Sequence, residues 1–181
     1  MPHPLWNEAY ATGQLPWDTG QPEPLLVEFV TSGAVTVSPT LEIGAGTGTN
    51  AIWMAERGFD LLGVDVSPLA VERAQAKMAG RTLRCRFSAW DFLAAPPSGG
   101  PFKFVFDRGC FHVFDEPGER DRFAAQVAAV LAPGESFHTW DPGKMGTVPF
   151  EIRRRCKAAV TTPKLGSACR VIAPVRVSNE K

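Results

Sequence analysis

Short apolar segments alternate with amphipathic segments along most of the chain, beginning at Thr40. Apolar runs of this length predict strands, and the stretches with helical spacing that follow three of them predict helices. Such alternation is typical of an α/β fold with a mostly parallel sheet and helices on both faces. The predicted strands are residues 40–43, 59–65, 82–88, 102–107 and 136–140, and the predicted helices are residues 51–57, 67–80 and 117–132.

Two of the predicted strands differ in pattern. Residues 82–88 alternate apolar side chains with Arg84 and Arg86, which predicts one solvated face and a place at or near the sheet edge. Residues 102–107 are mostly apolar, which predicts a central strand. The helix after the second strand begins at Ser67 and Pro68, a good N-cap and a good first helical residue.

The two flanks of this α/β pattern have a different composition. Residues 1–24 hold five prolines and three aromatic residues with little periodicity, and a short helix is expected over residues 25–30. Residues 144–181 carry nine basic side chains against two acidic ones, with an amphipathic helix expected over residues 151–159. We therefore expect one domain over residues 1–181, with an N-terminal arm and a divergent basic C-terminal segment.

Composition excludes several classes of function. The chain of 181 residues is 44% hydrophobic and 21% charged, with 19 basic and 19 acidic side chains. A formal charge of zero provides no electrostatic surface for wrapping nucleic acid, so we expect no nucleic-acid partner. No leader-like N-terminus and no apolar stretch of about 18 residues is found, so we expect no membrane association and a cytoplasmic protein.

The cysteines and histidines do not form a metal-binding pattern. Neighbouring cysteines are at least 13 positions apart, no CxxC pair occurs, and the three histidines are scattered. Structural zinc sites need closely spaced ligand pairs, so no metal is expected. Cys110 is interpreted as a small buried hydrophobic residue.

A glycine-rich turn carries the clearest chemical signal. Gly44, Gly46 and Gly48 follow the first predicted strand and precede a helix, so backbone N–H groups can face a ligand there. A dinucleotide fingerprint would need glycine or alanine where Thr49 stands, which weakens a pyrophosphate ligand. The carboxylate of Glu42 beside the turn favours a ligand that carries positive charge, such as a cationic amino-acid-like cofactor.

This motif, with Asp65 ending the next strand, resembles the class I S-adenosylmethionine-dependent methyltransferases. The resemblance implies their Rossmann-like sheet of seven strands, with the final strands uncertain here, and S-adenosyl-L-methionine as cofactor. It implies that Asp65 binds the ribose hydroxyls and that Asp91, after the third strand, binds the adenine amino group. The other cofactor-binding residues implied are Glu42, Gly44, Gly46, Gly48, Val66, Trp90, Phe92 and Trp17.

A narrower resemblance is carried by residues 6–18 and 106–112, which are similar to segments of thiopurine, thiol and halide methyltransferases and tellurite-resistance-type relatives. In that group an aromatic N-terminal segment folds over the cofactor and helps form the acceptor pocket. The acceptor-pocket residues that this resemblance implies are Trp6, Tyr10, Arg108 and His112. Asp107 lies beside the expected position of the transferred methyl group, and we expect it to act in catalysis.

The sequence therefore predicts a methyltransferase for a small acceptor, a thiol or another soft nucleophile such as a thiopurine, halide or chalcogen anion. The Asp-Arg-Gly-Cys-Phe segment at Asp107 lacks the Pro-Pro-aromatic motif of enzymes that methylate amino groups of bases. A noncatalytic subunit that binds S-adenosylmethionine or S-adenosylhomocysteine is the alternative, and a NAD-dependent oxidoreductase comes third. A monomer or weak dimer is expected.

Overall fold

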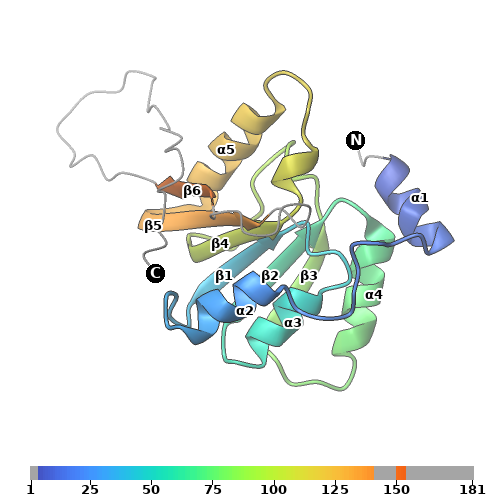
Figure 1. Cartoon of the computed structure of the whole chain (residues 1–181), viewed down its shortest axis with the longest axis horizontal. Helices are drawn as coiled ribbons and strands as arrows, with labels where there is room; N and C mark the ends of the chain where they lie inside the picture. Colours follow the sequence, from blue (N-terminus) through green and yellow to red (C-terminus); the bar gives the residue numbers. More distant parts are fainter. Residues whose placement is uncertain (1–3, 141–149, 154–181) are drawn as a thin grey trace, which may run out of the picture.

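A six-stranded sheet forms the centre of the molecule (Figure 1). The computed structural model describes residues 4–140 and 150–153. The strand order is β3-β2-β1-β4-β5-β6, in which the first five strands are parallel and β6 is antiparallel to β5. The strands are β1 (Pro39–Ile43), β2 (Asp60–Asp65), β3 (Cys85–Ala89), β4 (Phe102–Arg108), β5 (Leu131–Trp140) and β6 (Phe150–Arg153).

Helices cover both faces of the sheet, as the sequence predicts. On one face α2, α3 and α4 enclose a core that includes Leu26, Met54 and Phe106, and on the other face α5 packs on Val105 and Phe137. The helices are α1 (Pro4–Thr12), α2 (Pro24–Thr31), α3 (Thr49–Ala55), α4 (Pro68–Met78) and α5 (Glu119–Val130), with a 3-10 turn η1 (Phe111–Val113) before α5.

The predicted positions of the strands are confirmed. β4 lies between β1 and β5 and is almost wholly buried, and β3 forms the edge with Arg86 exposed. In α4 the Ser67 side chain accepts a hydrogen bond from the Ala70 N–H and Pro68 is the first helical residue, as expected. The fifth strand is longer than predicted, because β5 begins at Leu131 and passes through Pro133 and Gly134.

The helix predicted over residues 151–159 is wrong in its first three residues, which belong to β6. Phe150 and Ile152 alternate with Glu151 and Arg153, a period of two that suits a strand. β6 pairs with β5 from Ser136 to Thr139 and so satisfies backbone groups along that strand. Residues 154–159, and residues 160–177 where the final strands of the resemblance would fall, lie outside the described residues.

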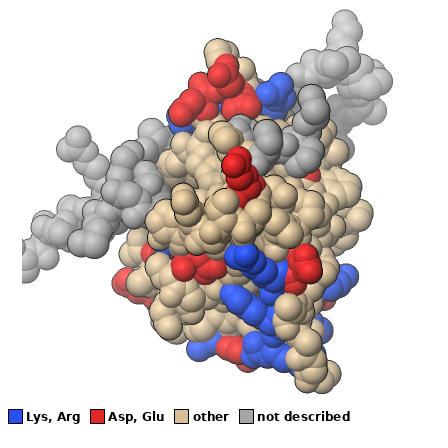
Figure 2. All heavy atoms as spheres, turned by 90° about the vertical axis from the view of Figure 1, so that its right-hand side faces the viewer, with Lys and Arg blue, Asp and Glu red and all other residues tan. Residues whose placement is uncertain are grey.

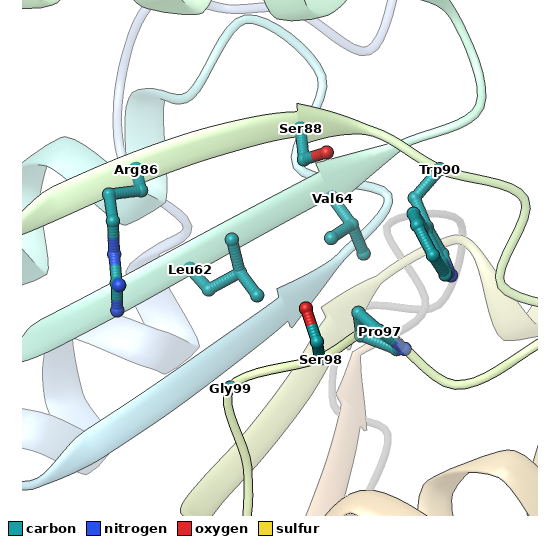
Figure 3. Close-up of a pocket in the computed structure, with 8 residues that line it drawn as sticks. All are labelled: Leu62, Val64, Arg86, Ser88, Trp90, Pro97, Ser98 and Gly99. Atoms are coloured by element: carbon teal, nitrogen blue, oxygen red, sulfur yellow. The ribbon is translucent and has the colours of Figure 1, made fainter.

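The segment over residues 90–101 joins β3 to β4 through turns rather than a helix. A small pocket lies beside it on the sheet face of Leu62 and Val64, next to Trp90 and Pro97 (Figure 3). The position of this pocket matters for the site, because Trp90 is one of the residues that the resemblance implies for cofactor binding.

The arm over residues 1–24 contains a helix that the sequence pattern did not predict. α1 packs against α4, and Asn7 Oδ1 accepts hydrogen bonds from Ser67 Oγ at 2.9 Å and from the Leu69 N–H at 3.4 Å. No helix in the described ranges is long and apolar enough to cross a membrane. On the side where α1 and α4 lie, basic side chains are interspersed with acidic ones (Figure 2).

Candidate functional site

Three carboxylates gather at the carboxyl ends of neighbouring strands. Glu42 lies near the end of β1, Asp65 ends β2 and Asp107 lies near the end of β4, with exposed fractions of 1%, 8% and 0%. In open α/β sheets ligands bind at this edge, where neighbouring strands are connected in opposite directions. The fold therefore brings the three predicted acids to the expected ligand-binding edge.

The glycine turn follows β1 at the same edge. Gly44, Gly46 and Gly48 have φ angles of +70°, +53° and +79°, which residues other than glycine rarely adopt. The space beside the turn is also limited, because a Cβ at Gly44 would lie 2.8 Å from Cys110 Cβ and a Cβ at Gly46 would lie 2.9 Å from the Tyr10 hydroxyl. Glycine is required here for both the backbone conformation and the close packing.

Asp65 is fixed by the turn and by the start of α4. Its Oδ2 accepts a hydrogen bond from the Gly46 N–H and its Oδ1 accepts one from the Ser67 N–H, both at 2.8 Å. Burial raises the pKa of Asp65, while these two backbone donors act in the opposite direction. Each carboxylate oxygen can accept more than one hydrogen bond, so Asp65 retains capacity for two ligand hydroxyls.

Glu42 has one satisfied and one unsatisfied oxygen. Its Oε1 accepts a hydrogen bond from Asn50 Nδ2 at 3.0 Å, whereas its buried Oε2 has no hydrogen-bond partner within the described part of the chain. Burial, with a smaller contribution from the nearby Asp65 and Asp107, raises the pKa of Glu42 to about 8, and hydrogen bonds from Asn50 and the Ala51 backbone act in the opposite direction. A ligand cation at Oε2 would satisfy this oxygen and stabilise the ionised form.

Asp107 is likewise half satisfied. Its Oδ2 accepts a hydrogen bond from the Phe111 N–H at 2.9 Å, and its Oδ1 has no partner that meets hydrogen-bond geometry among residues 4–140. Thr139 pairs with Asp107 in the register of β4 and β5, and the Thr139 side chain opposes the rise in pKa that burial causes. The net effect raises the pKa of Asp107 to about 7, so this carboxyl can gain or lose a proton near neutral pH.

The N-terminal arm crosses this edge of the sheet. Asp18 Oδ2 accepts a hydrogen bond at 2.8 Å from the hydroxyl of Thr47 in the glycine turn, and Thr47 in turn accepts one from Lys77 Nζ at 2.6 Å. Arg73 of α4 donates to the Tyr10 carbonyl at 2.6 Å. These contacts attach the arm to the glycine turn and to α4.

The arm aromatics form one cluster beside the glycine turn. Trp17 meets Trp6 edge to face with ring centroids 5.4 Å apart, and it meets Tyr10 at 6.3 Å. Tyr10 is 3% exposed and its hydroxyl accepts a hydrogen bond from Trp17 Nε1 at 3.4 Å. Burial raises the pKa of Tyr10 to about 12, so the hydroxyl stays protonated. The structure thus places Tyr10 next to Gly46, on the side expected for the cofactor.

The other two residues assigned to the acceptor pocket, Arg108 and His112, do not belong to the ring contacts of this cluster. Arg108 donates from Nε to Glu23 Oε2 at 2.6 Å and from Nη1 to the Trp17 carbonyl at 2.9 Å, so it attaches the arm to β4. His112 lies in the η1 turn with its ring against Phe111 at a centroid distance of 5.8 Å.

The loop after β3 is ordered by its own side chains. Asp91 Oδ1 accepts hydrogen bonds from the N–H groups of Leu93 and Ala94, and Trp90 Nε1 donates to the Ala95 carbonyl at 2.7 Å. Trp90 lines the pocket on the sheet face (Figure 3). Phe92 is 5% exposed and lies in the core with its centroid 5.1 Å from that of Phe123. Val66, directly after Asp65, is half-buried.

Sequence reasoning missed the polar residues that connect these parts. Asn50 links Glu42 to the arm, because the Glu23 N–H donates to Asn50 Oδ1, and the Glu23 side chain accepts a hydrogen bond from Arg108. The one available signal was the polar Asn50 directly before the apolar run of residues 51–55 in the same helix. Among the residues with described positions, no group of three or more His, Cys, Asp or Glu side chains could hold a metal ion.

Comparison with known proteins gives a family match and several relatives. The family model described as "Methyltransferase domain" matches residues 40–134. A "Probable thiol methyltransferase 2" of Arabidopsis thaliana is 32% identical over 83% of this chain and 63% of its own length. A "2-heptyl-1-hydroxyquinolin-4(1H)-one methyltransferase" of Mycobacteroides abscessus is 30% identical over 67% of this chain and 53% of its own length.

A solved structure is similar as well. The structure described as "Conversion of a Disulfide Bond into a Thioacetal Group during Echinomycin Biosynthesis" matches with a TM-score of 0.63 and 30% identity. The match covers 68% of this chain and 50% of the solved chain. The chain therefore spans between about half and two thirds of the length of these three relatives.

Proposed function

The chain belongs to the methyltransferase domain family, among the class I S-adenosylmethionine-dependent methyltransferases, and we propose that it methylates a small acceptor through a soft nucleophilic atom, a thiol first of all. The methyl donor of this family is S-adenosyl-L-methionine. It supplies an electrophilic methyl group on a sulfonium, and it also carries an ammonium.

The observation that supports this proposal most is the pair of buried carboxylates, Glu42 and Asp107, at the carboxyl ends of β1 and β4, each with one oxygen that lacks a hydrogen-bond partner among the described residues. Glu42 Oε2 and Asp107 Oδ1 have no hydrogen-bond partner in the part of the chain that is described. Leaving such atoms unsatisfied costs about 1–3 kcal/mol each. A cationic ligand above the glycine turn would offset this cost, whereas an anionic one would be repelled, so the donor set suits S-adenosylmethionine.

The ribose, the adenine and the ammonium of the donor are each assigned a partner in the chain. Asp65, held by two backbone N–H groups, is oriented to bind the ribose hydroxyls, and Asp91 is assigned to the adenine amino group. Glu42 carries the negative charge for the ammonium. A side chain at Gly44 or Gly46 would meet Cys110 or the Tyr10 hydroxyl, so glycine keeps the turn in close contact with these residues.

The residues near the reacting centre position the acceptor and exclude water. The aromatic cluster of Trp6, Tyr10 and Trp17 lies beside the glycine turn. When the leaving group is already activated, holding the two reactants in line supplies most of the acceleration. Asp107 can take a proton from a neutral acceptor, since its pKa is raised to about 7. A thiol loses its proton to Asp107 or to water, its sulfur bonds to the methyl carbon, and the carbon–sulfonium bond breaks.

A thiol acceptor fits this site because it needs little acid–base assistance. With a pKa of about 8.5, a free thiol is a few per cent ionised at pH 7 and is intrinsically nucleophilic. The Arabidopsis relative and the solved structure have names that refer to sulfur chemistry, and the Mycobacteroides relative is named for a hydroxyquinolone. Their names suggest acceptors to test, with sulfur first.

Methyl transfer from labelled S-adenosylmethionine tests the proposal directly. Small thiols, thiopurines, halides, selenite and tellurite are offered as acceptors, beside a hydroxyquinolone, a nucleobase amine and a protein substrate. The rate with a thiol should rise with pH through the acceptor's own pKa, and Asp107→Asn should lower it without abolishing it. Turnover of the amine or protein alone would overturn the acceptor assignment, and cofactor binding with no turnover at all would identify a noncatalytic subunit.

A further inference from the structure

Asn50 lies between the buried carboxylate of Glu42 and the N-terminal arm. It is the second residue of α3 and is 8% exposed. Its Nδ2 donates to Glu42 Oε1 at 3.0 Å, and its Oδ1 accepts a hydrogen bond from the Glu23 N–H at 2.8 Å. One amide group therefore joins the candidate cofactor site to the arm residue that precedes α2.

The partners of Asn50 fix the orientation of its amide. An ionised carboxylate only accepts hydrogen bonds, and a backbone N–H only donates them. With Glu42 ionised, Nδ2 must face Glu42 and Oδ1 must face Glu23. A protonated Glu42 accepts a weaker hydrogen bond from Nδ2 than the carboxylate does, so Asn50 is held less firmly and so is the acceptor that it offers to the Glu23 N–H.

Glu23 is held from a second direction at the same time. Its side chain pairs with Arg108 Nε at 2.6 Å, and Arg108 directly follows Asp107 in β4. The arm residue Glu23 is thus attached to Asn50, which bonds to Glu42, and to Arg108, which follows Asp107 in sequence. Loss of either attachment leaves the arm held at that point by the other alone.

We propose that Asn50 is a positioning residue that makes the seating of the arm depend on the ligand bound at Glu42. The inference rests on the proposed function in one respect, which is that the ligand brings an ammonium to Glu42 Oε2. The ionisable groups that act on Glu42 from neighbouring strands favour its protonated form, and a ligand cation favours the ionised form that fixes Asn50. Those groups are Asp65 of β2 and Asp107 of β4, which act in addition to burial. The thiol of Cys85 on β3 also faces Glu42, and the carboxylate raises the pKa of that thiol.

Hydrogen exchange at a single amide can test this coupling. Within residues 21–24 only Gln21 and Glu23 have a backbone N–H, because Pro22 and Pro24 have none. Deuterium uptake by a peptide over this segment therefore reports exchange at the Glu23 N–H, which donates a hydrogen bond to Asn50 Oδ1. The measurement is made with and without saturating S-adenosylhomocysteine, which keeps the ammonium, and calorimetry measures the binding itself.

Two variants separate the two hydrogen bonds of Asn50, and a third is the control. Asn50→Ala removes both bonds, while Asn50→Asp keeps an acceptor for Glu23 and loses the donor to Glu42. Gln75→Ala removes another side-chain amide bond, from Gln75 Nε2 to the Phe87 carbonyl at 3.2 Å, which joins α4 to β3 and involves no arm residue.

In the unchanged chain and in Gln75→Ala, S-adenosylhomocysteine should slow exchange at Glu23 by about tenfold or more. In Asn50→Ala exchange should be fast with and without ligand, and in Asn50→Asp it should be slow in both states. Should Asn50→Ala fail to fold, Asn50→Asp still decides. Ligand-dependent slowing of the same size in either Asn50 variant would overturn the coupling alone, whereas a wild-type chain that binds no S-adenosylhomocysteine would overturn the proposed function as well.

Discussion

At the scale of single residues, the three buried carboxylates differ in how many of their oxygen atoms accept a hydrogen bond. Both oxygens of Asp65 accept backbone N–H groups, so its position is set before any ligand binds. Glu42 and Asp107 each keep one oxygen without a partner among the described residues, so these two are the atoms whose environment a ligand would change most. Asp65 is a preformed contact, and Glu42 and Asp107 respond to charge.

Asp65→Ala should weaken S-adenosylhomocysteine binding by about 2–3 kcal/mol, because it removes a charge-assisted contact to two ribose hydroxyls. The matched control is Asp60→Ala, at the opposite end of β2, where Asp60 pairs with the exposed Arg86. Calorimetry measures both variants, and thermal unfolding checks the loss of the Gly46 and Ser67 bonds. Equal affinity in Asp65→Ala and wild type would remove the ribose assignment.

Gly46→Ala should displace the arm as well as strain the turn. The new Cβ would lie 2.9 Å from the Tyr10 hydroxyl, and φ of +53° costs a non-glycine residue about 1 kcal/mol. Tyr10→Phe removes that hydroxyl, so the double variant should regain part of the cofactor affinity that Gly46→Ala loses. Strictly additive effects of the two changes would show that Tyr10 and Gly46 do not meet.

The sequence predicted those site residues whose type is demanded by backbone geometry or charge. Gly44 and Gly46 stand where only glycine fits, and Asp65 ends a strand beside them, so motif spacing located all three. Asn50 and Glu23 escaped prediction because their roles depend on a contact across 27 positions of sequence, between segments whose packing no local pattern specifies. The ion pair of Arg108 with Glu23 escaped prediction for the same reason, and the assignment of Arg108 to the acceptor pocket stays a prediction.

At the scale of elements, the arm depends on the sheet-bearing part of the chain for its structure. α1 has nine residues, and isolated helices of that length are marginal in water, so its contacts with α4 stabilise it. The pattern predicted an arm without a helix because Pro-rich segments suppress helical periodicity. Conversely, the pattern predicted a helix where β6 lies, because an alternation of only four residues is too short to decide between helix and strand. Pairing with β5 selects the strand.

Deleting residues 1–18 should therefore impair function more than folding. Over its described residues, 4–24, the arm contributes no strand to the sheet, so a cooperative thermal transition should remain. The melting temperature should be lower, because Tyr10 and its neighbours are lost from the packing. Cofactor affinity or turnover should fall sharply, since the aromatic cover and the Asp18–Thr47 bond are absent. A truncated chain as active as the full one would reduce the arm to packing.

At the scale of the whole molecule, three buried carboxyl groups at the carboxyl ends of the strands make the stability of the folded chain depend on pH. Burial raises the pKa values of Glu42 and Asp107 to about 8 and about 7, and it also raises that of Asp65. The folded chain therefore binds more protons at these positions than the unfolded chain does between about pH 4.5 and pH 8. Their contribution to stability is full below that window and is lost as the pH rises through the folded-state pKa values.

The melting temperature of the ligand-free chain should thus fall between pH 5.5 and pH 8.5. The slope should be smaller in Glu42→Gln, which stays neutral in the folded and unfolded states. Binding of S-adenosylhomocysteine should oppose the fall, because its ammonium stabilises ionised Glu42. Scanning calorimetry over the pH series measures these changes, and the same slope in Glu42→Gln as in wild type would contradict the assignment.

The attachment of the arm also determines the order in which the site can assemble. Its polar contacts join residues far apart in the chain, with 60 positions between Asn7 and Ser67, 63 between Tyr10 and Arg73, and 85 between Glu23 and Arg108. During synthesis the arm leaves the ribosome before its partners exist, and contacts of such long separation form late in folding. The aromatic residues beside the glycine turn are thus made before the rest of the site and enclosed after it, and a refolding chain should protect the amides of β1 before those of the arm.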